Sequence, residues 1–144
     1  MKFSTKIRYG IRTMLEIALH GDKDGILQKD IAKNQGLSFK YLDQIISSLK
    51  ASELISTVRG KKSGYKLTMK PSEITMLDIH NAFEPSLSIV DCLSNHIECP
   101  SEKNCAPRNL WKGLNSHIEN YLAQVTLEDL KRDQLRLDSQ KQEK

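Results

Sequence analysis

At 144 residues, the chain has room for one compact domain with an appended helix, and two full domains would be crowded. No apolar run approaches the roughly 18 residues that a membrane-spanning helix needs, so we expect no membrane partner. The amino-terminal MKFSTKIRYG has no hydrophobic signal segment, which favours a cytoplasmic location. In that reducing compartment, three cysteines are better interpreted as thiols or metal ligands than as a disulfide framework.

The charge is divided unevenly along the chain. Residues 1–70 hold 14 lysines and arginines against 6 acidic residues, a net of +8. Residues 71–144 hold 8 against 12, a net of −4. A basic half favours a polyanionic partner, because contacts with phosphates release counterions; the alternative is an ordinary solvated surface.

The first 52 residues predict three helices. The first covers Thr5 to His20 and the second covers Gln28 to Asn34. Gly36 permits a left-handed turn, Ser38 is a good N-cap, and the third helix follows to about Ser52. The buried stripe of this third helix is expected at Leu42, Ile45, Ile46 and Leu49.

A β-hairpin is predicted next. Leu54 to Arg59 alternates as a half-buried strand, and Tyr65 to Met69 returns along it. The link Gly60-Lys-Lys-Ser-Gly64 is a tight, basic tip. Two short helices joined by a glycine turn and followed by a basic hairpin predict a winged helix-turn-helix, which places its last helix in a DNA groove.

The polar face of the third helix supplies the candidate base contacts. Gln44 has the amide geometry to pair with adenine, Lys40 can donate to guanine or phosphate, and Asp43 can accept from cytosine. Arg59 at the wing edge suits a narrow minor groove. The remaining candidate DNA contacts are Ser38, Tyr41, Lys61, Lys62, Lys6 and Arg8, the last two interpreted equally well as solvated.

The second half of the chain predicts further helices. Thr75 to Phe83 begins with a capping-box pattern, and its His80 is expected at the surface or its boundary. Asn109 to Val125 is long and amphipathic, which favours a coiled-coil-like pairing with a second copy over packing wholly on its own domain. The predicted dimerisation residues are Trp111, Leu114, Ile118, Tyr121 and Val125. Thr126 then predicts a fresh helix start.

All three cysteines lie between these two helices. Cys92, Cys99 and Cys105 are separated by six and five residues, in a loop long enough to be functional. Thiolates bind zinc or iron–sulfur clusters, and a fourth ligand could come from His96, Glu98, Glu102 or another subunit. Redox-active thiols are the second interpretation and inert cysteines the third.

The chain resembles the Rrf-two family of bacterial transcription regulators, whose members include an iron–sulfur cluster regulator and a nitric-oxide-sensing repressor. The resemblance spans Tyr9 to Leu130. It is carried by DIAKNQGLSFKYLDQIISSLK, by ISTVRG…GY, by ITMLDIHNAFE and by the three-cysteine loop. It implies a homodimer on a palindromic operator, with Lys40 and Gln44 in the major groove and Arg59 in the minor groove. It also implies that the three cysteines hold a [2Fe–2S] or [4Fe–4S] cluster.

Three departures from the family pattern matter. The wing tip is Lys-Lys-Ser-Gly where Pro-Gly-Gly-Gly is usual, the first cysteine gap is six residues where five is commoner, and the fourth ligand is unassigned. Positions that supply that ligand in other members hold Arg108 and Arg8 here. These departures suggest a labile cluster, a substitute ligand or no cluster.

Together these patterns predict a mainly α fold with a small β-hairpin wing and a long dimerisation helix. We expect a DNA-binding domain over 1–84, a cysteine sensor loop over 85–107, a dimerisation region over 108–135 and a flexible tail over 136–144. The expected function is a DNA-binding regulator, preferentially a repressor, that binds double-stranded DNA and is modulated by a cluster or by thiol redox state. The alternative is a metal or cluster carrier that does not act on DNA. No nucleophile–base pair or nucleotide-binding loop predicts an enzyme.

Overall fold

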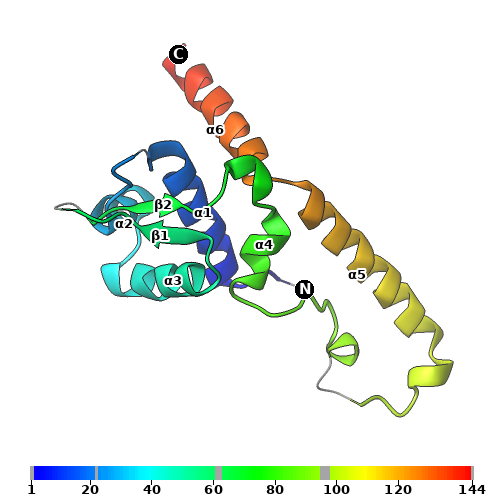
Figure 1. Ribbon diagram of the computed structural model, residues 1–144. Helices are drawn as coiled ribbons and strands as arrows, with labels where there is room; N and C mark the ends of the chain where they lie inside the picture. Colours follow the sequence, from blue (N-terminus) through cyan, green and yellow to red (C-terminus); the bar gives the residue numbers. More distant parts are fainter. Residues whose placement is uncertain (1, 22, 61–62, 95–97, 144) are drawn as a thin grey trace.

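The computed structural model describes residues 2–21, 23–60, 63–94 and 98–143, and its mainly helical fold carries a two-stranded hairpin (Figure 1). The helices and strands are α1 (Thr5–His20), α2 (Gln28–Gln35), α3 (Phe39–Ala51), β1 (Ile55–Thr57), β2 (Tyr65–Leu67), α4 (Met76–Asn81), α5 (Ala106–Gln124) and α6 (Leu127–Gln142). Single 3-10 turns occur at Pro71–Glu73, Asp91–Leu93 and Glu102–Asn104. This architecture confirms the predicted fold class.

Local capping explains why the first three helices lie where the sequence predicts them. Ser4 Oγ accepts a hydrogen bond from the Ile7 amide at the start of α1, and Ser38 Oγ accepts one from the Tyr41 amide at the start of α3. Gly36 ends α2 with φ 63° and ψ 36°, the left-handed conformation that glycine adopts without a Cβ penalty. The predicted turn is thereby confirmed.

The strands of the wing are shorter than predicted, and an additional pair of backbone hydrogen bonds attaches the wing to the residue before Leu27. β1 and β2 pair antiparallel over three residues each, from Ile55 opposite Leu67 to Thr57 opposite Tyr65. Tyr65 also exchanges two backbone hydrogen bonds with Ile26, at 2.9 and 2.8 Å. Ile26 lies just before α2, outside any predicted strand, so the base of the wing is tied directly to the helix-turn-helix.

The start of α4 confirms the predicted capping box, but the burial of His80 differs from the sequence-based prediction. Thr75 and Asp78 exchange hydrogen bonds of 2.9 and 3.1 Å at the helix start. The helix ends at Asn81, two residues before the predicted Phe83. His80 is only 2% exposed, because the ring of Phe3 packs edge-on against it at 6.1 Å between centroids. The surface or boundary assignment was therefore wrong, and the contact comes from Phe3, a residue far away in the sequence.

The hydrophobic core extends past residue 84, where the predicted DNA-binding domain ends. Leu127, the first residue of α6, is completely buried in the cluster formed by α1, α3, the wing and α4. Its amide donates to the Ile74 carbonyl at 2.8 Å, and the Met76 amide donates to the Val125 carbonyl at 2.9 Å. The winged domain thus includes the start of α6, which follows α5 in the chain.

α5 forms an arm that leaves this body, and the cysteine segment lies near its far end (Figure 1). It begins at Ala106, three residues before the predicted start, with Pro107 in its first turn, where proline is tolerated. All 19 residues of α5 are described, and none is buried. None of the helices in the described ranges combines the length and apolar character that a membrane crossing requires.

α6 begins at a second capping box and continues further than expected. Thr126 is its N-cap, and the hydrogen bond that the Thr126 amide donates lowers the pKa of the Asp129 carboxyl. The helix continues to Gln142, so most of the predicted flexible tail (136–144) is helical. Acidic residues in the first turn and Lys141 in the last turn complement the helix dipole.

Truncating Leu127 tests whether α6 belongs to the winged core. Leu127→Ala is expected to lower the free energy of unfolding by about 2–5 kcal/mol, because it deletes a fully buried side chain. Leu135→Ala, on the same helix at a site that is 50% exposed, is the matched control and should cost about 0.5 kcal/mol. Denaturant unfolding measures both. Equal effects would mean that residues 1–84 hold their core without α6.

Candidate nucleic-acid interface

The helix-turn-helix presents one polar face to solvent. Leu42, Ile45 and Leu49 of α3 are fully buried. On the other side of the same helix, Lys40, Asp43, Gln44 and Ser47 are exposed. Because the buried stripe fixes the rotation of α3, the polar residues are held at a defined orientation on the surface of the domain. The structure therefore brings together the three residues predicted to contact bases.

Two other predicted contact residues have structural partners. The Ser38 hydroxyl is occupied as the N-cap of α3, 3.1 Å from the Tyr41 amide. Tyr41 is half-buried and packs edge-on against Tyr9 of α1, with ring centroids 6.0 Å apart. Arg12 lies over the Tyr9 ring at 5.0 Å and donates to Gln35 of α2 at 2.6 Å. These contacts hold α1, α2 and α3 together behind the polar face.

Gln28, the first residue of α2, connects the recognition helix to the wing. Its Nε2 donates to Asp43 Oδ1 at 3.2 Å and approaches the Phe39 carbonyl at 3.5 Å. Its Oε1 accepts from the Tyr65 hydroxyl at 3.3 Å. Partial burial, and then the negative charge of Asp43, raise the pKa of the Tyr65 phenol, so this hydroxyl keeps the proton that it donates. Sequence reasoning missed Gln28 and Tyr65. Gln28 is 15 positions from Asp43 and 37 positions from Tyr65, and polar contacts over such separations leave no periodic signal in the sequence.

Phe39 is a third residue that the sequence pattern did not single out. It lies three residues before Leu42 and seven before Ile46, the spacing of the buried stripe, yet 57% of it is exposed. It occupies the first position of α3, beside the polar face. A large apolar side chain at this place is suited to contact a thymine methyl group.

The wing brings Arg59 to the surface next to the described part of the hairpin. Arg59 is exposed just beyond β1. Lys61 and Lys62, also predicted to contact DNA, lie outside the described residues. Just before β2, a Cβ on Gly64 would lie 2.5 Å from the Asp24 carbonyl oxygen, so only glycine allows the wing to approach the α1–α2 loop this closely.

Lys6 and Arg8 lie in the first turn of α1. Both are exposed, and Arg8 donates to Thr5 Oγ1 at 3.2 Å. Arg8 also lines a largely apolar pocket of about 450 Å³ between α1, α4 and the end of α5. The other lining residues are Lys2, Phe3, Ile7, Ile11, Met76, His80 and Leu122. A phosphate contact by Lys6 or Arg8 stays a prediction.

The three cysteines do not assemble into a metal site within the described residues. Cys92 lies in a 3-10 turn, Cys105 directly precedes α5 and Cys99 lies between them; all three are half-buried free thiols. No three histidine, cysteine or acidic side chains gather as a ligand group anywhere in the described ranges.

Of the candidate fourth ligands, Glu98 and Glu102 are described and do not complete such a group. His96 lies outside the described residues. Glu102 forms an ion pair of 3.0 Å with Arg108, and Glu98 is exposed. Cysteine is a suitable ligand type for an iron–sulfur cluster, but the described residues hold no assembled site for one.

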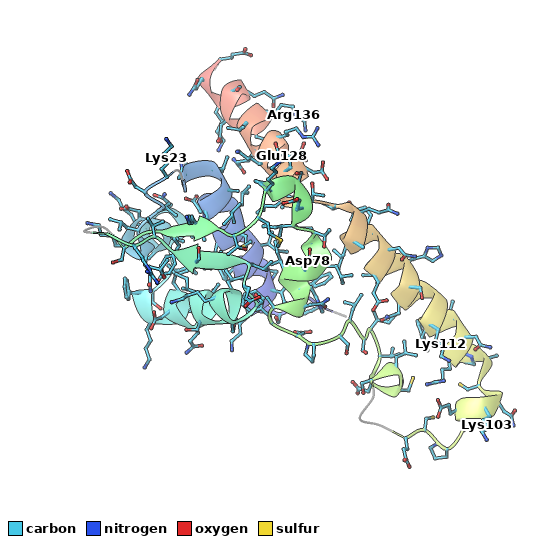
Figure 2. The ribbon with its side chains drawn as sticks, in the orientation of Figure 1. Lys23, Asp78, Lys103, Lys112, Glu128 and Arg136 are labelled. Carbon is cyan, nitrogen blue, oxygen red and sulfur yellow. The ribbon has the colours of Figure 1, made fainter. Side chains whose placement is uncertain are left out.

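The predicted dimerisation residues divide into two groups. Leu114 and Tyr121 are 43% and 66% exposed, and Leu110 nearby is 63% exposed. At about 100° per residue, these three lie within about 40° of one another on α5 and form one apolar stripe. Figure 2 shows the side chains of this arm, with Lys112 labelled, standing clear of the winged body. Trp111 and Ile118 are half-buried, and Val125 instead packs against the core of its own domain.

The chain matches known proteins over nearly its whole length. Residues 3–133 match the family model described as Rrf2, iron-dependent transcriptional regulator. The HTH-type transcriptional regulator IscR of Vibrio atlanticus is 34% identical over 133 residues, which are 92% of this chain and 76% of the relative.

Two solved structures share the fold at similar identity. The global cysteine regulator CymR of B. subtilis is 35% identical with a TM-score of 0.75, covering 92% of this chain and 97% of that one. T. potens IscR is 31% identical with a TM-score of 0.74, covering 92% and 88%. These relatives are transcription regulators, not enzymes. The chain belongs to the Rrf2 family of winged-helix, DNA-binding transcription regulators.

Proposed function

We propose that two copies of this chain bind a palindromic operator, each inserting α3 into the major groove and directing its wing toward the minor groove. The observation that carries this proposal is the exposed polar face of α3, with Lys40, Asp43 and Gln44 fixed above a buried stripe. Recognition helices contact base edges with their first turns, and these residues lie there. Each subunit would then read one half-site.

Each contact has a distinct chemical role. Gln44 offers an amide to adenine, Lys40 donates to guanine or to phosphate, and Asp43 accepts from cytosine. Arg59 is exposed at the wing and can enter a narrow minor groove, where the negative potential is strongest. The net charge of +8 over residues 1–70 supports the electrostatic part of binding.

The second subunit is inferred from α5. Leu110, Leu114 and Tyr121 form an exposed apolar stripe on an arm whose other face points toward its own domain. Pairing two such stripes in a coiled-coil-like contact would remove them from water. An isologous contact of this kind gives the two-fold symmetry that a palindromic site requires.

The proposed signal input is the cysteine segment, through its thiols. The three cysteines are concentrated in one segment at the start of the dimerisation arm. These thiolates can act by holding an iron–sulfur cluster or, alternatively, by direct oxidation. The family model is described as iron-dependent, so the iron content of the purified protein is measured together with the oxidation state of its thiols.

The DNA contacts predict a strong salt dependence and a specific role for Arg59. The logarithm of the binding constant should fall linearly with the logarithm of the salt concentration. Arg59→Ala should weaken binding about 5- to 100-fold and reduce this slope by about 1. The matched control is Arg136→Ala on α6, where the arginine pairs with Asp133 at 3.4 Å in the acidic half of the chain. Fluorescence anisotropy with a duplex of the chain's own promoter region measures both, and salt-independent binding would contradict the proposal.

The dimer contact predicts that a charge in the apolar stripe separates the subunits. Leu114→Asp should convert a dimer into a monomer in sedimentation, because the carboxylate would be buried without a partner. Ser116→Asp introduces the same charge on the exposed opposite side of α5 and should leave the dimer intact. A dimer that persists in Leu114→Asp would place the contact elsewhere.

The cysteine segment predicts DNA binding that depends on oxidation. Operator affinity should differ about 5- to 150-fold between the reduced and the oxidised protein. Cys92→Ala, Cys99→Ala and Cys105→Ala should each reduce that difference. An iron and sulfide count after anaerobic purification distinguishes a cluster from free thiols. Unchanged affinity in every variant and every redox state would exclude the cysteines as the input.

A further inference from the structure

Gln28 occupies a position from which one side chain contacts both DNA-facing elements. It begins α2, yet its amide reaches Asp43 on α3, the Phe39 carbonyl and the Tyr65 hydroxyl on β2. Asp43 is one of the exposed residues on the proposed recognition face. Gln28 is itself only half-exposed.

The orientation of the Gln28 amide follows from its neighbours. The Asp43 carboxylate and the Phe39 carbonyl only accept hydrogen bonds, so the NH₂ group must face them. The carbonyl oxygen then faces Tyr65, whose hydroxyl donates to it at 3.3 Å. The Tyr65 backbone is held in turn by two hydrogen bonds to Ile26, two residues before Gln28. Every partner therefore favours the same orientation of the amide.

This arrangement restricts the Asp43 carboxylate. A free aspartate on a helix surface samples several χ1 rotamers and presents its acceptors in several directions. With Oδ1 engaged by Gln28, the carboxylate is oriented before DNA arrives, and that hydrogen bond leaves Oδ2 available as an acceptor. An acceptor oriented in advance loses less conformational entropy when it meets a base.

We propose that Gln28 is a positioning residue for base selection, which orients Asp43 toward the exocyclic amino group of a cytosine in each half-site. This inference rests on the proposed function, because it presumes that α3 enters the major groove. Gln28 does not touch the DNA. It acts through Asp43, while its bond with Tyr65 keeps the wing and recognition helix in one fixed arrangement.

The test is a double-mutant cycle that is read as base preference. Wild-type protein and the variants Gln28→Met, Asp43→Ala and Gln28→Met/Asp43→Ala each select from a pool of duplexes with a randomised centre, and the bound fraction is sequenced. Methionine keeps the length of the glutamine side chain and removes its hydrogen bonds to Asp43, Phe39 and Tyr65. Gln140→Leu, on the exposed face of α6, is the control for loss of a glutamine.

The expected result is a local change in selectivity. Wild-type protein should prefer cytosine at one position of each half-site by about 5- to 150-fold, the range of one good base contact. Gln28→Met should reduce that preference to about 3-fold or less and leave the other positions unchanged. In the Asp43→Ala background, Gln28→Met should change nothing further, because residues that act through one contact are not additive. Tyr65→Phe should lower the same preference by a smaller factor.

Other outcomes separate the inference from the proposed function. An unchanged preference in Gln28→Met, or an affinity loss that is equal for all sequences, would overturn the positioning role. A further effect of Gln28→Met in the Asp43→Ala background would do the same. If the wild-type protein neither enriches a motif nor binds a mixed-sequence duplex, the proposed function itself fails. Thermal unfolding of every variant shows whether a loss comes from unfolding.

Discussion

Burial of one side of α3 is the constraint on which the rest of the structure depends. Leu42, Ile45 and Leu49 are completely enclosed, so the helix cannot rotate without opening the core. The same constraint places Lys40 and Gln44 in solvent. A DNA-recognition helix needs side chains whose ends are free and whose backbone is fixed, and a half-buried helix provides both. α1, α2, the wing, α4 and the start of α6 all contribute to the core that encloses this stripe.

The return of the chain through Leu127 explains how an exposed arm is combined with a stable body. α5 buries none of its residues, and a helix of this kind has little support from packing. Its carboxyl end is held where Val125 and Leu127 exchange backbone hydrogen bonds with the segment before α4. At the middle of the helix, Asn115 donates to the Leu87 carbonyl and accepts from the Ile89 amide, both at 3.0 Å. The arm is therefore tied to the body at its base and to the segment that leads into the cysteines along its length.

The sequence predicted the features that depend on local chemistry. The N-cap at Ser38, the glycine turn at Gly36 and the helix start at Thr126 each follow from residues within four positions of one another, and all three are confirmed. The burial of His80 and the Gln28 network depend on residues far apart in the chain, so periodicity carried no sign of them.

These contacts also limit where regulation can act in the proposed dimer. The hydrogen bonds of Gln28 and the two backbone hydrogen bonds between Ile26 and Tyr65 join the wing and the helix-turn-helix into one rigid DNA-binding unit. A packed unit of this kind moves as a whole more readily than it deforms. A signal at the cysteines would then act through α5 on the distance and angle between the DNA-binding units of the two subunits. Asn115 of α5 is hydrogen-bonded to the Ile89 amide, in the segment that leads into the cysteines. Half-site spacing is a geometric requirement for a dimer on DNA, so in the proposed dimer a small change in α5 would be enough to alter operator affinity.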